Sequence, residues 1–201
     1  MAPEYELKKI YDEYYPRILQ YLTRLAGPND AEDLAQDVFD KINSGLGGFH
    51  GKSKLSTWIY RIATNTAIDR SRSAAHKHVT RHVAMEEGAD SETECVLEDH
   101  KPHATDQLVI QKEMSDCIHE YIDKLPPDYK TVIVLSELES LANKEIAEIL
   151  DITLDNVKIR LHRARTKLRA VLNEACEFYY NEQNTLACDR KQVRILSKTS
   201  E

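Results

Sequence analysis

The sequence predicts an all-α protein, in which two small helical domains are joined by a flexible linker and the C-terminal domain contains a helix-turn-helix. Helix-forming residues dominate its 201 positions, and only 6 Gly and 6 Pro interrupt them. Apolar residues recur three or four positions apart on either side of a stretch without periodicity, residues 73–105. The expected division is 1–73 and 106–173 for the domains, 74–105 for the linker and 174–201 for a tail.

The N-terminal domain is expected to contain three helices: Glu4 to Leu25, Asn29 or Asp30 to Ile42, and Leu55 to about Arg72. Pro16 lies inside the first helix and should kink or split it, because proline removes a backbone hydrogen bond. Acidic residues in the first turn of the second helix complement the helix dipole. Periodicity alone predicts that the polar face of this helix is simply exposed to solvent.

A glycine-rich loop, SGLGGFHGKSK at residues 44–54, leads to the third helix. Its aromatic residue, Phe49, is expected either to pack on the core as a lid or to contact a ligand. In the third helix, Trp58 falls on the core stripe. The opposite face of that helix mixes charged residues, an amide and an aromatic side chain: Arg61, Asn65, Asp69 and Arg72, with Tyr60 and Thr64 beside them. Cations, amides and aromatic rings are the groups that hydrogen-bond to unpaired bases and stack on them.

The linker begins with histidines and cations and then turns acidic, so no secondary structure is expected there. The segment from Glu86 to Asp106 contains eight acidic residues and a single lysine, Lys101. They contribute strongly to the net charge of −7. A basic helix elsewhere in the chain can still attract a polyanion, because charges act mainly within a Debye length of about 8 Å.

The C-terminal domain is expected to resume helices at Asp106. Its most informative stretch runs from residue 143 to 169 and is typical of a helix-turn-helix. Its turn has only three residues, Asp151 to Thr153. Asp151 replaces the glycine common at this position, and aspartate tolerates a left-handed backbone. Ile152 should fill the gap between the helices, and Thr153 or Asp155 can cap the second one.

The second helix of this motif combines one apolar stripe with six cations: Lys158, Arg160, Arg163, Arg165, Lys167 and Arg169. Such a helix suits the major groove of DNA, where the first turns of a recognition helix normally enter. The alternative is a basic surface helix that only faces solvent. An extension of this helix through Phe178 is left open, and the last dozen residues are expected to be loose.

The four cysteines, Cys95, Cys117, Cys176 and Cys188, form no CxxC pair and are expected to be free thiols. Cys117 lies between core positions and should be buried. The role of the tail pair is open between a metal or redox sensor and a partner contact. No apolar run is long enough to span a membrane and no signal peptide is recognisable, so a cytoplasmic protein is expected.

Four stretches together resemble the extracytoplasmic-function (ECF) class of bacterial sigma factors: DAEDLAQDVFDKI (30–42), STWIYRIATNTAIDRSR (56–72), LPPDYKTVIVLSELESLANKEIAEIL (125–150) and DNVKIRLHRARTKLR (155–169). The resemblance covers about residues 5–172 apart from the linker. It implies a non-enzymatic protein that binds core RNA polymerase through the β′ and β subunits and directs promoter-specific initiation. It also implies control by an anti-sigma factor, and no cofactor or metal.

The resemblance further implies three sets of site residues. The polymerase-binding set replaces the solvent-exposed interpretation of the second helix and comprises Asp33, Gln36, Asp37, Asp40 and Lys41. The −10 set melts the promoter and holds a flipped base, with Asn65 nearest that base: Phe49, Lys52, Lys54, Arg61, Asn65 and Asp69. The −35 set comprises Asn156, Lys158, Ile159, His162 and Arg163, with Arg160 and Arg165 as phosphate partners. Ile159 replaces a small polar residue and is expected to touch a thymine methyl group.

Three alternatives remain to be compared with this interpretation. A stand-alone helix-turn-helix regulator would bind its operator tightly without polymerase. An interaction protein without a DNA role would not need so basic a recognition helix. An enzyme is not supported, because no Ser/His/Asp set, metal-ligand cluster or phosphate-binding loop is recognisable.

Overall fold

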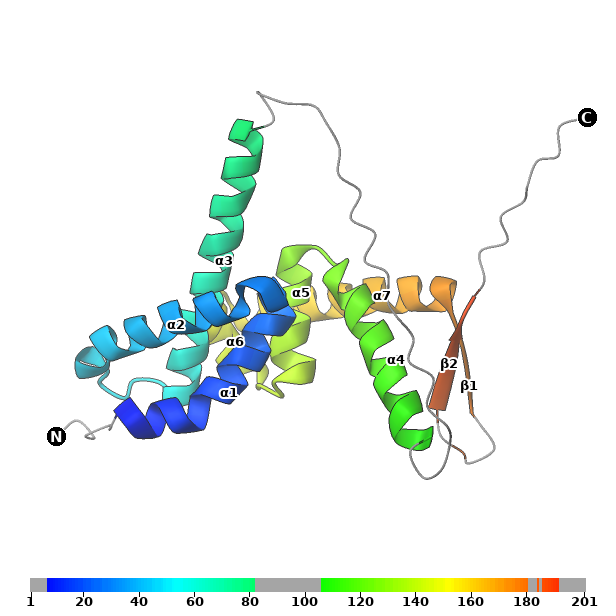
Figure 1. Cartoon of the computed structure of the whole chain (residues 1–201), viewed down its shortest axis with the longest axis horizontal. Coiled ribbons are helices and arrows are strands. Elements are labelled where there is room, and N and C mark those ends of the chain that lie inside the picture. Colours follow the sequence, from blue (N-terminus) through cyan, green and yellow to red (C-terminus); the bar gives the residue numbers. More distant parts are fainter. Residues whose placement is uncertain (1–6, 82–105, 181–183, 185, 192–201) are drawn as a thin grey trace, which may run out of the picture.

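The computed structural model describes residues 7–81, 106–180, 184 and 186–191. Seven α-helices and one small β-hairpin make up this described part of the chain (Figure 1). The prediction of an all-α fold is confirmed, with the hairpin in the tail as the exception. None of the helices in these residues is both long and apolar enough to cross a membrane. The expected linker lies mostly outside the described residues.

Three helices form the N-terminal part: α1 (Leu7–Ala26), α2 (Pro28–Gly45) and α3 (Leu55–Arg81), with a short 3₁₀ turn, η1 (Leu46–Gly48), after α2. Gly27 separates α1 from α2 with a φ of 93°, which glycine adopts readily. The ribbon of α1, which contains Pro16, bends and stays one helix (Figure 1). Helix α3 extends nine residues past the expected end at Arg72, because no glycine or proline interrupts residues 73–81.

The C-terminal part consists of α4 (Asp106–Asp123), α5 (Pro127–Ile133), η2 (Val134–Leu138), α6 (Asn143–Leu150) and α7 (Leu154–Ala175). Pro127 occupies the first turn of α5, where its missing N–H costs nothing. The element η2 is a π-helical turn, in which the Glu139 amide donates to the Val134 carbonyl at 3.0 Å. Such a widened turn shifts the direction of the side chains that follow it.

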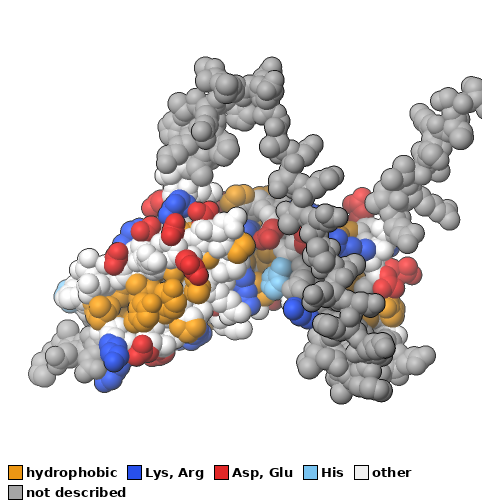
Figure 2. Space-filling view, in the orientation of Figure 1, with side chains coloured by type: hydrophobic (Ala, Val, Ile, Leu, Met, Phe, Trp, Pro, Cys, Tyr) orange, Lys and Arg blue, Asp and Glu red, His pale blue; other side chains and the backbone are white. Residues whose placement is uncertain are grey.

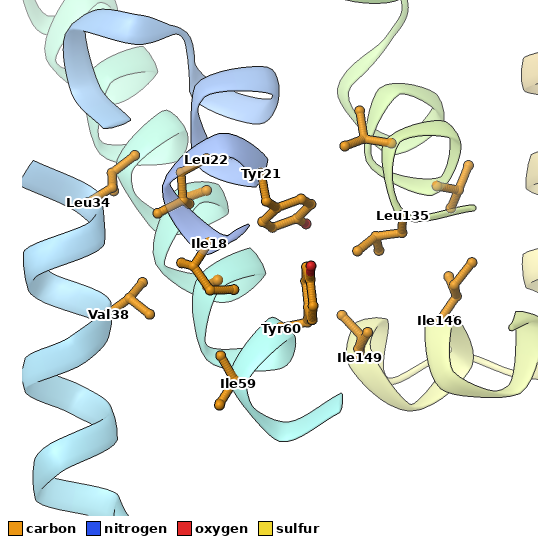
Figure 3. Packing of buried hydrophobic residues seen from close by; sticks show 14 of the residues in the cluster. Ile18, Tyr21, Leu22, Leu34, Val38, Ile59, Tyr60, Leu135, Ile146 and Ile149 are labelled. Atoms are coloured by element: carbon orange, nitrogen blue, oxygen red, sulfur yellow. The ribbon is translucent and has the colours of Figure 1, made fainter. Parts of the chain in front are cut away.

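The two parts share one hydrophobic core. A continuous cluster of buried apolar side chains runs from Ile10 on α1 to Ala164 on α7. Figure 3 shows Tyr21 and Tyr60 between the N-terminal helices and the residues Leu135 and Ile149 of the C-terminal part. Burying a large apolar side chain stabilises a fold by roughly 1.5–3 kcal/mol. The shared core therefore holds the two parts in a closed arrangement.

The tail forms a β-hairpin after α7. Strands β1 (Cys176–Tyr180) and β2 (Leu186–Arg190) pair antiparallel, with Phe178 opposite Cys188. The extension of α7 through Phe178 is wrong, since Cys176 is already extended, with φ −127° and ψ 149°. Three consecutive aromatic residues, 178–180, favour a strand. The Lys191 amide donates to the Ala175 carbonyl at 2.8 Å and closes the hairpin against the end of α7.

Candidate nucleic-acid and polymerase interfaces

The helix-turn-helix is formed by α6, the turn at residues 151–153 and α7. Asp151 adopts the expected left-handed backbone, with φ 53° and ψ 46°. The Thr153 hydroxyl caps α7 by accepting a hydrogen bond from the Asn156 amide at 3.2 Å. Val157 and Leu161 are buried on the inner face of α7, so the spacing of apolar residues fixes which face turns outward.

The outward face of α7 presents the five residues predicted to read base edges: Asn156, Lys158, Ile159, His162 and Arg163. All five are exposed. Ile159 is 47% exposed, so this face includes an apolar side chain that a partner can contact. Beside them lies an open groove of about 400 Å³, lined by Tyr129, His162, Arg163, Thr166, Lys167 and Ala170. The face therefore offers hydrogen-bond donors, cations and one apolar contact.

The two arginines predicted to contact phosphates have partners within the protein. Arg165 donates to Glu137 Oε1 through Nη2 at 2.6 Å and through Nε at 3.1 Å. Arg160 Nη2 lies 3.5 Å from Asp128 Oδ2. Both carboxylates belong to the segments before α6, so these arginines also connect α7 to α5 and η2. By contrast, Arg163 forms no ion pair within the described residues.

The predicted polymerase-binding residues lie along one side of α2, and all five are exposed: Asp33, Gln36, Asp37, Asp40 and Lys41. Acidic side chains are visible along the edge of this helix in Figure 2. Two of the five have contacts with α3. Asp37 lies 3.6 Å from Arg70, and the Lys41 ammonium donates to the Thr66 hydroxyl at 2.9 Å. Within the described residues, no ion pair involves Asp33 or Asp40.

Five of the six residues of the −10 set are exposed, namely Lys52, Lys54, Arg61, Asn65 and Asp69. Phe49 is only 7% exposed and packs on Trp58, with ring centroids 5.1 Å apart. Of the two roles expected for Phe49, packing on the core or contact with a ligand, the structure shows packing on the core.

Sequence reasoning misplaced two neighbours of the −10 set. Tyr60 and Thr64 are fully buried and do not lie on an open face for bases. The Tyr21 and Thr64 hydroxyls are hydrogen-bonded at 2.8 Å, and the Tyr60 hydroxyl donates to Glu139 Oε2 at 2.5 Å. Burial raises the pKa of Tyr60, and the hydrogen bond with Glu139 adds to that increase. The C-terminal part covers this side of α3, which no periodicity within α3 reveals.

Two cations of the −10 set contact the helix-turn-helix. The Lys54 ammonium donates to Glu145 Oε1 at 2.8 Å, and this hydrogen bond raises the pKa of Lys54. The same contact lowers the pKa of the Glu145 carboxyl, which also accepts a hydrogen bond from the Ala142 amide. Arg61 lies 3.6 Å from the Asp151 carboxylate. The closed arrangement therefore uses acids of the helix-turn-helix as partners for cations predicted to contact the −10 element.

Comparison with known proteins identifies both parts. Residues 10–77 match the family described as Sigma-70 region 2, and residues 115–168 match Sigma-70, region 4. The chain is 38% identical to the ECF RNA polymerase sigma factor SigW of Bacillus subtilis, over 82% of this chain and 88% of that protein. It is 31% identical to the ECF RNA polymerase sigma-E factor of Haemophilus influenzae, over 78% and 82% of the two chains.

Among solved structures, the fold is similar to the sigma factor RpoE of Bartonella quintana, crystallised with the anti-sigma factor NepR. The TM-score is 0.62 at 19% identity, and the match covers 83% of this chain and 96% of that one. Because the chain is 38% identical to SigW over 82% of its length, and both helical parts match sigma-70 regions, this chain belongs to the ECF family of RNA polymerase sigma factors.

Proposed function

We propose that this sigma factor directs promoter-specific initiation with a different helix for each partner. Residues 1–73 dock on core polymerase through the exposed side of α2 and melt the −10 element with the loop before α3 and the exposed residues of α3. Residues 106–173 read the −35 element with α7. Residues 74–105 act as the connection between them, and the chain works in the cytoplasm, where polymerase is.

The exposed face of α7 carries this proposal. Its first turns present an amide, an imidazole and cations, which hydrogen-bond to base edges and phosphates in the major groove. Ile159 adds an apolar contact that suits a thymine methyl group. The acids that neutralise Arg160 and Arg165 lie behind this face and leave Arg163 available.

Promoter binding requires the closed arrangement to open. Lys54 pairs with Glu145, and Arg61 pairs with Asp151. These two cations cannot keep those partners and bind a DNA strand at the same time. These exposed ion pairs are individually weak, so phosphate groups can compete for their cations. Binding to polymerase would supply the free energy that separates the shared core.

An anti-sigma factor is proposed as the regulator. The support is that a sigma factor of the same fold was crystallised with such a partner. A protein that favours the closed arrangement would keep both DNA-binding surfaces from acting together.

Transcription from a promoter library by core polymerase, with and without the purified chain, tests the proposal. We expect initiation at a defined set of promoters only when the chain is present, and weak DNA binding by the chain alone. If the chain alone binds one operator tightly and polymerase adds nothing, it is a stand-alone regulator, the alternative left open by the sequence.

A further inference from the structure

Three cysteines meet where the C-terminal hairpin packs on α4. Cys117 lies on α4, Cys176 begins β1 and Cys188 lies on β2. Cys117 and Cys176 are 7% and 2% exposed, whereas Cys188 is partly exposed. All three are free thiols. They come from two distant parts of the chain, so the hairpin creates a cluster that the spacing of the cysteines does not show.

The register of the hairpin places two of these cysteines on one face. Cys176 is opposite Arg190 and Cys188 is opposite Phe178, so the two cysteines are diagonal neighbours on the same side of the hairpin. That side meets α4, where Arg190 Nη2 donates to Glu120 Oε2 at 2.5 Å. Burial and then the neighbouring Cys117 and Cys188 thiols raise the pKa of Cys176, so Cys176 lies close to both. Cys176 is therefore the central member of the cluster.

Metal binding does not explain this arrangement. Among the described residues, no group of three or more His, Cys, Asp or Glu side chains is placed to hold a metal ion. Burial is also the largest cause that raises the pKa of the Cys176 and Cys188 thiols. Protonated thiols are poor metal ligands and react only slowly with oxidants.

We propose that Cys176 and Cys188 are a reversible oxidation site, at which a hydroperoxide converts the two thiols into a disulfide. Cys188 reacts first, because it alone in the cluster is partly open to solvent. Its sulfur attacks the peroxide, the O–O bond breaks, and Cys188 becomes a sulfenic acid while an alcohol leaves. The Cys176 sulfur then attacks the Cys188 sulfur, the S–O bond breaks, and water leaves with the Cys176 proton. Overall, two thiols and one hydroperoxide give a disulfide, an alcohol and water.

The disulfide would change the hairpin. Diagonal residues on paired strands are typically about 7–8 Å apart, while a disulfide usually joins Cα atoms that are about 4.4–6.8 Å apart. Oxidation should therefore draw the two strands together around Cys176 and Cys188. Arg190 is two residues from Cys188, so its contact with Glu120 on α4 lies within the region that moves.

Mapping the disulfide in the full-length chain tests the proposal. A Cys95→Ser background leaves only the three clustered thiols. After treatment with cumene hydroperoxide and blocking of free thiols by N-ethylmaleimide, mass spectrometry should show a Cys176–Cys188 disulfide and one alkylated cysteine, Cys117. Dithiothreitol should restore all three thiols. Three alkylated cysteines after oxidation, or disulfides only between chains, would overturn the proposal.

Single variants separate the roles. Cys176→Ser should stop disulfide formation and leave a Cys188 sulfenic acid that dimedone traps. Cys188→Ser, at the more exposed position and thus safer for folding, should abolish the reaction with peroxide. Cys117→Ser is the matched control and should form the Cys176–Cys188 disulfide as before. If Cys117→Ser removes the disulfide, or if Cys188→Ser reacts as fast as the background, the assignment is wrong.

Discussion

The Tyr60 hydroxyl donates a hydrogen bond of 2.5 Å to Glu139 Oε2, and this contact joins α3 to the segment that leads into the helix-turn-helix. Arg24 of α1 contacts the other oxygen of the same carboxylate at 3.0 Å. The Glu139 side chain is only 7% exposed. One buried carboxylate thus receives donors from two helices of the N-terminal part, and it lies at the centre of the closed arrangement.

Glu139→Ala should therefore favour the open arrangement. A buried donor that loses its acceptor costs about 1–3 kcal/mol, which corresponds to roughly five- to 150-fold in the ratio of closed to open molecules. Small-angle X-ray scattering should show a larger radius of gyration for the variant. Glu137→Ala is the control, because Glu137 pairs with Arg165 within the C-terminal part. Equal dimensions for the Glu139→Ala variant and the unmodified chain would contradict this role.

The Lys54–Glu145 pair should make the closed arrangement sensitive to acid. The hydrogen bond from Lys54 lowers the pKa of Glu145 below its ordinary value of 4.5. A carboxyl with a lowered pKa stabilises the closed form fully above the ordinary value, and that contribution is lost as the pH falls through the lowered value. Scattering measured from pH 7 to pH 3 should show opening at the acid end. A Glu145→Gln variant cannot be protonated at this position and should therefore lose this part of the acid-induced opening. If the variant opens with the same pH profile as the unmodified chain, the Lys54–Glu145 pair is not the cause.

Arg163→Ala should weaken recognition of the −35 element by about 1–3 kcal/mol if Arg163 contacts a base. Its side chain is exposed beside the groove on α7. The measurement is transcription by the holoenzyme on promoters with single changes in the −35 element. Arg169→Ala removes the same charge further along α7 and should leave the promoter preference intact. A preference that Arg163→Ala also leaves unchanged would exclude base contact.

Asp40→Lys should reduce binding to core polymerase without unfolding the protein, because Asp40 is exposed on α2 and its side chain has no ion pair within the described residues. Asp40 is a cleaner target than Asp37, which lies 3.6 Å from Arg70. The amount of holoenzyme recovered by size-exclusion chromatography reports the effect. Glu13→Lys makes the same charge change on α1 and should not alter recovery. Full recovery with Asp40→Lys would place the polymerase contact elsewhere.

The turn of the helix-turn-helix offers a test of backbone strain. Asp151 has a φ of 53°, a conformation that costs most residues roughly 1–2 kcal/mol. Asp151→Gly and Asp151→Ala both remove the contact with Arg61, but only glycine removes the strain. Urea unfolding should therefore show the glycine variant to be more stable than the alanine variant by about 1 kcal/mol. Equal stability of the two variants would mean that the turn relaxes.

The local elements were predictable because their signals are local. The cap at Thr153, the left-handed Asp151 and the exposed side of α2 each follow from a few neighbouring residues. The exposure of Tyr60 was predicted wrongly because α3 packs against other helices on two sides. On the second side its partner is Glu139, which is 79 positions away in the sequence. The length of α3 was underestimated, since nothing in residues 73–81 forces either a helix or a linker.

The hairpin and its thiol cluster were beyond single-sequence reasoning for a related reason. Aromatic residues at 178–180 indicate a strand, but a strand needs a partner, and the pairing with Leu186–Arg190 is not visible in the spacing of the two cysteines. Cys117 was expected to be buried, and it is. Its place beside Cys176 depends on how α4 meets the tail, which is a property of the whole fold.

The π-helical turn at Val134–Leu138 has a consequence for insertions and deletions in this segment. It holds one more residue per turn than an α-helix, and it sends Glu137 toward Arg165 while Glu139 reaches Tyr60. Removing a single residue from this turn would rotate everything after it by about 100°, the angle between successive residues of a helix. The carboxylate of Glu139 would then point away from its donors, Tyr60 and Arg24. The number of residues in this turn therefore determines whether the two helical parts can pack together.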